Sequence, residues 1–180
     1  MLNEYSFGNI YIRHAVDDCP DDRNFTMHIH EQCEIYFFVS GNVKYLVEGS
    51  EYILDENSLM IMRPAEAHKA QITGCDRYER YAVNFPLSFA EIIDPDGTLV
   101  KAFTERQLGR NNLFEASSLD MSLVKKLFTE MCADNTDYER QLTIRTHLFM
   151  LLDMISRAFA EKKTGKFIPK SLSEKIDVCL

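Results

Sequence analysis

The spacing of apolar residues changes once along this chain, and that change constrains the fold more than any other feature of the sequence. Up to about residue 85, short β-rich segments alternate with turn residues; they span residues 5–14, 25–40, 43–48, 51–54, 59–62, 68–73 and 78–85. Strands this short and this regularly spaced indicate a sandwich or barrel. After residue 115 the apolar period becomes 3.6, which is that of a helix. The sequence therefore predicts a mainly β fold followed by C-terminal helices.

A turn signal, Gly41-Asn42, lies between two of the predicted strands. This pair can supply the positive φ values of a two-residue hairpin, so Phe38 is expected to face Tyr45, and Tyr36 to face Val47. Lys44 and Glu48 mark the opposite side of the hairpin as the outer one. The residues expected to point into the barrel are therefore Glu34, Tyr36, Phe38, Tyr45 and Val47.

Two amphipathic helices are predicted in residues 116–163, where they form an antiparallel hairpin. The first carries an apolar stripe from Leu119 to Met131, with Ser117 or Ser118 as its N-cap. The second spans about residues 138–160, and its apolar surface is broader than one contact requires. Both of its stripes could pack on the barrel and the first helix, or one could form a homodimer interface. That interface would consist of Ile144, Leu148, Leu151, Met154, Ile155 and Ala158.

Charge separates the end of the chain from the rest. The 28 acidic and 20 basic residues give a net charge of -8, which argues against binding to nucleic acid or to an anionic membrane by this chain. Residues 164–180 are predicted to be a linker followed by the start of a helix, so we expect a further domain beyond residue 180. The predicted organisation is a barrel in residues 1–115, a helical hairpin in 116–163 and this connecting segment.

The cysteines and the N-terminal residues give expectations about the cellular compartment. The five cysteines are all at least 14 positions apart, so no disulfide framework is expected and a reducing cytoplasm fits best. The first twenty residues lack the basic start and apolar block of a signal peptide, and no apolar run is long enough to predict a membrane span.

Histidine and glutamate residues form the most informative chemical pattern. His28, His30 and Glu34 share one parity, so on a regular strand they would face the barrel interior together. With His68, at the start of another predicted strand, they could coordinate a divalent transition metal such as Zn, Fe, Mn or Ni. Alternatively, no metal is required, the histidines are hydrogen-bonded at the barrel mouth, and Glu34 pairs with one of them or with Arg80.

The same residues carry a family resemblance. The pattern formed by His28, His30, Glu34 and Gly41 resembles the first cupin motif. The stretch RPAEAH, which contains Pro64 and His68, resembles the second. More specifically, residues 24–85 resemble the N-terminal sensor domain of AraC/XylS-type bacterial transcription regulators. The chain departs from the general cupin pattern at Asp22, where a glycine is usual, and in the turn DENS before Leu59.

The resemblance implies a cupin-type jelly-roll barrel that binds a small polar effector, often a sugar. It also implies helices that mediate dimerisation and a separate domain that binds DNA. Candidate effector contacts are Tyr36, Phe38, Tyr45, His30, Glu34 and His68, although each aromatic ring could instead simply fill the barrel. This hypothesis assigns no catalytic residue. The competing hypothesis is a metal-dependent cupin enzyme, such as a dioxygenase or sugar isomerase, with His28, His30, Glu34 and His68 as metal ligands.

Overall fold

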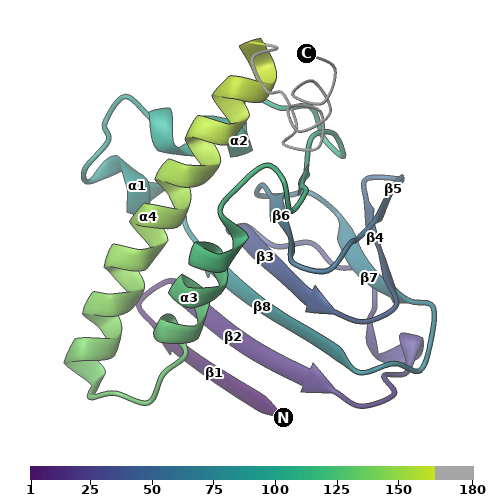
Figure 1. Ribbon diagram of the computed structural model, residues 1–180. Helices are drawn as coiled ribbons and strands as arrows, with labels where there is room; N and C mark the ends of the chain where they lie inside the picture. The colour runs from purple at the N-terminus through teal and green to yellow at the C-terminus, as the bar shows by residue number, and fades with distance from the viewer. Residues whose placement is uncertain (165–180) are drawn as a thin grey trace, which may run out of the picture.

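The computed structural model describes residues 1–164. Within them, six strands form one antiparallel sheet in the order β1 (Leu2–Phe7), β2 (Ile10–Asp17), β8 (Tyr78–Phe85), β3 (Cys33–Ser40), β6 (Ser58–Met62) and β9 (Leu113–Phe114). A second antiparallel sheet has the order β5 (Ser50–Ile53), β4 (Val43–Val47) and β7 (His68–Ile72) (Figure 1). The predicted connecting segment after Thr164 lies outside the described residues.

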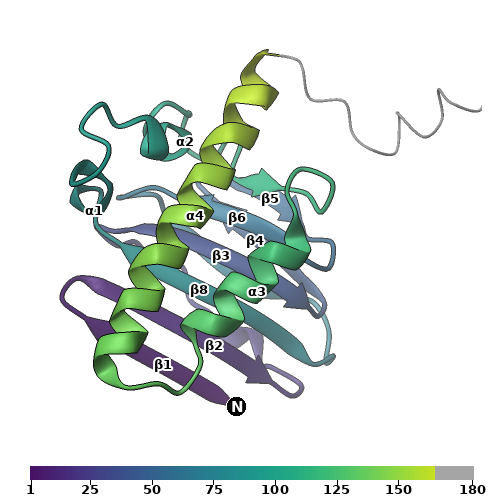
Figure 2. The same cartoon turned by 60° about the vertical axis from the view of Figure 1, so that its left-hand side comes forward.

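Two helices cover one face of the six-stranded sheet. They are α3 (Met121–Met131) and the long α4 (Asp137–Thr164), which run antiparallel across the strands (Figure 2). Between β8 and β9 the chain forms three short helical turns, α1 (Ser88–Glu91), η2 (Thr98–Val100) and α2 (Lys101–Thr104), and a fourth, η1 (Asp22–Asn24), precedes β3. The N-cap of α3 is Asp120, whose side chain accepts a hydrogen bond from the backbone N–H of Leu123, so neither Ser117 nor Ser118 serves as the cap.

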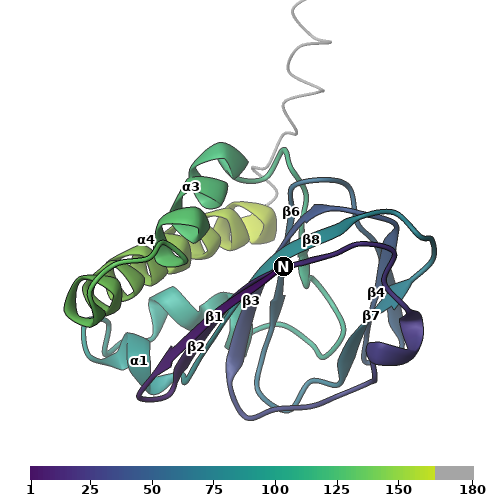
Figure 3. The same cartoon turned by 90° about the horizontal axis from the view of Figure 1, so that it is seen from below.

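The strand β3 separates two apolar clusters because alternate side chains point to opposite faces of a sheet. On the outer face, Ile35, Phe37 and Val39 pack with α3 and α4. On the inner face, Tyr36 and Phe38 pack with residues of the second sheet. Figure 3 shows the helices on one side of this sheet and β4 and β7 on the other. The predicted mainly β fold with C-terminal helices is therefore confirmed.

The predicted hairpin at Gly41-Asn42 is wrong. The strand β3 pairs with β6 and β8, and β4 pairs with β5 and β7, so the turn carries the chain from one sheet to the other. Gly41 has a φ of +132°, and a Cβ atom there would lie 3.1 Å from the Cα of Tyr78. The expected inward orientation of Tyr36, Phe38, Tyr45 and Val47 is nevertheless confirmed, because parity along a strand does not depend on which strand is its partner.

Two of the predicted strands are also corrected. Residues 5–14 contain a turn at Gly8 and Asn9 that divides them into β1 and β2. Residues 25–32 are not a strand, apart from a single bridge between His28 and His68, and the regular strand begins only at Cys33. The first correction follows from glycine at a positive φ of 53°, which reverses the chain.

The prediction of no disulfide is wrong for one pair, since Cys19 and Cys75 are bonded across a sequence separation of 56 residues. Their loops meet because β2 and β8 are neighbouring strands, with Asp17 opposite Tyr78 at the ends of the ladder. The spacing of the cysteines along the sequence does not show that the fold brings Cys19 and Cys75 close together. The bond removes the cysteine-based support for a reducing compartment. Cys33 and Cys132 are free and buried.

The apolar surface of α4 lies mainly inside the chain. Five of the six residues assigned to a dimer interface are buried in the helix-facing core: Ile144, Leu148, Leu151, Ile155 and Ala158. Met154 is partly buried against the same core. The structure thus uses this surface for packing on the sheet and α3, which was the other interpretation of the broad apolar stripe. Among residues 1–164, no helix is both long enough and apolar enough to cross a membrane.

Candidate functional site

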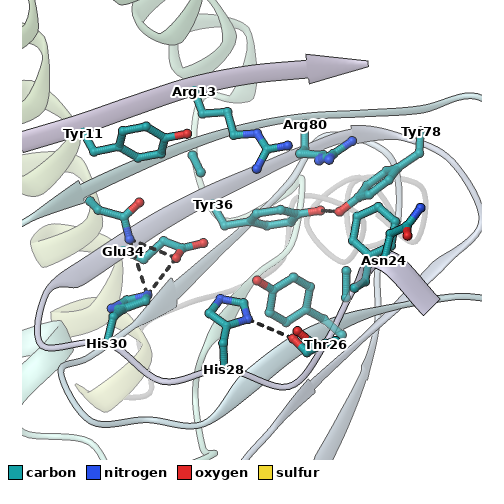
Figure 4. Close-up of a pocket in the computed structure, with 15 residues that line it drawn as sticks. Tyr11, Arg13, Asn24, Thr26, His28, His30, Glu34, Tyr36, Tyr78 and Arg80 are labelled. Atoms are coloured by element: carbon teal, nitrogen blue, oxygen red, sulfur yellow. Dashed lines mark hydrogen bonds and ion pairs between the residues drawn. The ribbon is translucent and has the colours of Figure 1, made fainter. Parts of the chain in front are cut away.

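A cavity of about 320 Å³ opens between the two sheets. Its walls come from the inner faces of β2, β3 and β8, from β4 and β7, and from the irregular segment before β3 (Figure 4). The lining residues are Tyr11, Arg13, Asn24, Phe25, Thr26, His28, His30, Glu34, Tyr36, Tyr45, Ala70, Tyr78, Arg80, Ala82 and Asn84. Its volume is at the lower end of the range of small-molecule sites, so it suits a small metabolite.

Histidine and glutamate side chains converge at one end of this cavity. One potential ligand atom each from His28, His30, Glu34 and His68 lies within 4.8 Å of the others. The strand parity that predicted this grouping is not what produces it, since His28 and His30 precede β3. Instead, backbone hydrogen bonds in both directions between His28 and His68, at 3.1 and 3.0 Å, hold the irregular segment beside β7.

The three imidazole rings are oriented alike by backbone carbonyl groups. The Nδ1 atom of His28 lies 3.0 Å from the Thr26 oxygen, and that of His68 lies 2.7 Å from the Glu66 oxygen. His30 Nδ1 lies 2.9 Å from the Gln32 oxygen. Because a carbonyl oxygen only accepts, each Nδ1 carries a hydrogen, and each Nε2 is left to face the cluster.

The Glu34 carboxylate completes the cluster. Its Oε2 atom lies 3.0 Å from His30 Nε2 and 3.5 Å from His68 Nε2. His68 Nε2 is buried and has no hydrogen-bond partner among the described residues. A buried nitrogen without a partner, next to a carboxylate and two further Nε2 atoms, fits the donor set of a divalent transition metal. The four side chains can therefore hold a metal ion.

Charge within the cluster is balanced through these contacts. Burial opposes ionisation of Glu34, but the neighbouring imidazoles of His30 and His68 outweigh it and keep the pKa of Glu34 well below its ordinary value. Burial likewise opposes protonation of His68, but the negative charge of Glu34, 3.5 Å away, raises the pKa of His68 above its ordinary value. The carboxylate thus favours positive charge at this position, from either a proton or a metal ion.

Aromatic rings form the middle of the cavity wall. The hydroxyl groups of Tyr36 and Tyr78 are hydrogen-bonded to each other, and the ring of Tyr45 lies 4.8 Å from that of Tyr36. Of the six predicted effector contacts, Tyr36, Tyr45, His30 and Glu34 line the cavity. Phe38 and His68 are wholly buried and lie outside the lining. Phe38 therefore fills the barrel interior, as the alternative interpretation allowed.

Several residues that line the cavity were not predicted from the sequence, although strand parity could have identified them. Tyr11 and Arg13 lie two positions apart on β2 and so share one face. Tyr78, Arg80 and Asn84 likewise share one face of β8. The same period-two count that was applied to β3 would have placed them on one face.

The suggested pairing of Glu34 with Arg80 is wrong. Arg80 forms an ion pair with Asp17 and lies 4.2 Å above the ring of Tyr78. The Oε2 atom of Glu34 instead lies 3.0 Å from His30 Nε2 and accepts a hydrogen bond of 3.0 Å from the Asn84 amide.

Comparison with known families identifies this architecture. The model of the AraC-like ligand binding domain matches residues 14–152, which is more than half of the chain. The chain belongs to this family. The AraC-like domain and its cupin-type barrel, expected from the two sequence motifs, are thereby confirmed. No curated protein gives a significant match to the chain.

Solved structures similar to this AraC-like domain are distant in sequence. A protein of Photorhabdus luminescens is 10% identical over 43% of this chain and 63% of its own, with a TM-score of 0.38, so less than two thirds of its length is spanned. A cupin 2 conserved barrel protein from Salinispora arenicola is 14% identical over 54% of this chain and 82% of its own, with a TM-score of 0.41. An RmlC-like cupin protein from Methanocaldococcus jannaschii is 14% identical over 48% and 79% of the two chains, with a TM-score of 0.41.

Proposed function

We propose that this AraC-like domain is the effector-sensing part of a bacterial transcription regulator. The observation that carries the proposal is the cavity of about 320 Å³ between the two sheets, lined by aromatic rings and hydrogen-bonding groups, in a chain of this family. The effector is a small polar metabolite, which would include a sugar. The domain acts in the cytoplasm, where the bacterial chromosome lies, and it has no catalytic role.

The effector is held chiefly by the inner side chains of β3, β4 and β8. The rings of Tyr36 and Tyr45 offer apolar faces, and His30, Glu34 and Asn84 offer hydrogen bonds in directions fixed by their mutual contacts. A polar ligand gains specificity when a few such groups are held in place before it binds.

Binding is communicated to the helices through the sheet itself. Neighbouring residues of β3 face the cavity and the helix layer in turn, and the ring of Phe37 stacks on that of Phe128 in α3 with a centroid distance of 5.8 Å. Tyr81 of β8 also contacts Phe128, at 5.6 Å. An effector that favours one position of these strands would therefore favour one packing of α3 and α4.

The helices act as the dimerisation unit, and DNA is bound by a domain outside this chain. Since the buried stripe of α4 is used within the chain, self-association through α4 would have to use its exposed apolar residues, Tyr138, Leu142 and Met150. No membrane is involved.

A divalent transition metal would be held by His28, His30, Glu34 and His68, although the proposed sensor function requires none. When bound, the metal would supply a Lewis-acidic contact for an oxygen atom of the effector. The chain's own contribution is to orient the three imidazoles through the carbonyl groups of Thr26, Gln32 and Glu66.

The proposal is tested by thermal denaturation of the chain with a panel of sugars and other polar metabolites. An effector present at 100 times its Kd stabilises the folded chain by about 2.7 kcal/mol. Ala82→Phe, which places a ring in the cavity, should abolish that stabilisation, and Ala70→Leu provides a milder filling of the same space. Ala133→Phe is the matched control, because Ala133 is exposed. Stabilisation that persists in both cavity-filling variants, or that no compound produces, would contradict the proposal.

A metal-dependent cupin enzyme is the second candidate, and the His/Glu cluster is the observation in its favour. Metal analysis and turnover assays separate the two functions. Stoichiometric iron or manganese, with turnover that is lost in Glu34→Gln and kept in Glu31→Gln, would establish the enzyme. Saturable effector binding without turnover would establish the sensor. Glu31 is the control because its side chain is exposed beside the site.

A further inference from the structure

Arg13 is a cavity residue whose charge is not balanced within the structure. It lies on β2 and lines the cavity, and its Nε atom is buried without a hydrogen-bond partner among the described residues. None of the ion pairs formed within residues 1–164 includes Arg13. In Figure 4, Arg13 and Arg80 lie along the side of the cavity opposite His28 and His30.

Each carboxylate that could balance this charge is engaged elsewhere. Glu4 is directly opposite Arg13 in the β1–β2 ladder, but its carboxylate accepts a hydrogen bond from the Tyr11 hydroxyl. Glu34 is bound by His30 and Asn84, and Asp17 is paired with Arg80. The cavity therefore contains one guanidinium group without a carboxylate partner.

An arginine in this position is suited to one class of ligand. Its planar guanidinium presents N–H donors in a fork that matches carboxylate and phosphate groups. Leaving a buried donor unsatisfied is unfavourable, so a ligand that supplies an acceptor gains affinity from it. The positive charge of Arg80 lies on the same side of the cavity, with the guanidinium over the rings of Tyr78 and Phe25 at 4.2 and 5.4 Å.

We infer that the effector is a small anion whose carboxylate or phosphate group is bound by Arg13. This inference rests on the proposed sensor function and narrows the effector from any polar metabolite to an acidic one. The rest of the ligand lies against Tyr36 and Phe25, and it must be small, since the cavity holds about 320 Å³.

The test uses acetate and inorganic phosphate as probes of the full chain labelled with ¹⁵N at arginine. The Nε–H signals are followed by NMR during titration at constant ionic strength. The Arg13 signal, identified by its loss in Arg13→Gln, should shift saturably with acetate, with phosphate or with both. The signal of Arg157, which is exposed and paired with Asp153, should not. Binding to acetate alone assigns a carboxylate effector, and binding to phosphate alone a phosphorylated one.

Substitution gives a second measurement. Arg13→Gln should weaken binding of the probe about tenfold or more, which is the loss expected for one charge-assisted hydrogen bond. Arg157→Gln should leave it unchanged. No saturable shift at Arg13 with either probe would overturn the inference, as would an unaltered affinity in Arg13→Gln. Binding of a neutral metabolite in the cavity without anion binding would overturn it too, while leaving the sensor function intact.

Discussion

At the scale of single residues, a fully buried ion pair supports the His/Glu cluster from behind. Glu66 and Arg106 are 0% and 4% exposed, and their side chains meet through two hydrogen bonds, one of them 2.6 Å long. The backbone N–H of Gly109 donates a further bond to Glu66 at 2.8 Å. The Glu66 carbonyl in turn orients His68. The pair therefore fixes both the loop before β7 and the ring at its start.

Removing one partner of this pair should be costly, because the other charge remains buried without compensation. Arg106→Met is expected to lower the free energy of unfolding by about 3–5 kcal/mol. The measurement is urea denaturation of the chain. The matched control is Arg157→Met, which breaks an exposed pair with Asp153 and should cost no more than about 1 kcal/mol. Equal losses in the two variants would show that the buried pair is not a stabilising contact.

The two free buried cysteines should be chemically inert in the folded chain. Burial raises the pKa of Cys33 and of Cys132 to about 12, so almost no reactive thiolate is present at pH 8. Iodoacetamide at that pH should leave both unmodified, as read by peptide mass spectrometry, and should modify both once urea unfolds the chain. Labelling of the native chain at the rate of an exposed cysteine would be the contrary result.

The sequence predicted the membership of the His/Glu cluster but not its geometry. The four residues were identified from strand parity and motif spacing, whereas a two-way backbone bridge between His28 and His68 brings them together. The period-two count places Arg13 on the same face of β2 as Tyr11, but whether that face lines a cavity depends on its strand partners. Those partners, β1 and β8, include one segment almost 70 positions away along the chain, and no local pattern reports on it.

At the scale of elements, the crossing at Gly41 shows the limit of local turn signals. A glycine before asparagine permits a hairpin, but the same conformational freedom permits a crossing between sheets. Here β3 is buried on both faces, so it lies in the interior of the sheet with a buried strand on each side and does not form a hairpin with β4. The neighbours are β6 and β8, which are also largely buried.

The disulfide between Cys19 and Cys75 is expected to stabilise the loop that precedes part of the cavity wall. That loop leads into η1 and contributes Asn24, Phe25 and Thr26 to the lining. For a closed loop of this length, chain entropy predicts a contribution of about 4 kcal/mol. Cys75→Ser should lower the free energy of unfolding by about 2–4 kcal/mol, measured in urea.

Reduction provides the control for that substitution. Treatment of the wild-type chain with dithiothreitol should reproduce the loss, and the same treatment should have no effect on Cys75→Ser. Detection of free thiols at both Cys19 and Cys75 in the oxidised protein would refute the pairing.

At the scale of the whole molecule, α4 belongs to the core of the domain. Leu148 is 0% exposed, whereas Met150, two positions later, is 44% exposed. Leu148→Asp should therefore unfold the chain, because it buries a charge without a partner. Met150→Asp should leave it folded. Circular dichroism and sedimentation distinguish these results from the alternative, in which Leu148→Asp yields a folded monomer and Leu148 lies at a subunit interface.

The change of apolar period predicted the order of the two layers, strands first and helices second. It could not predict which apolar residues of the helices would pack on the sheet and which on each other. The broad stripe on α4 is explained by packing against both the sheet and α3, and an amphipathic pattern does not distinguish a neighbour in the same chain from one in another. The helix predicted at the end of the chain lies outside the described residues.

The sheet that carries β3 and β8 is a single backbone thick, with the cavity on one side and the helices on the other. Under the proposed sensor function, the effector would bind against the same strands whose opposite faces contact α3 and α4. Because side chains alternate between the two faces of these strands, substitutions on the cavity side could change the ligand without altering the side chains that pack on the helices.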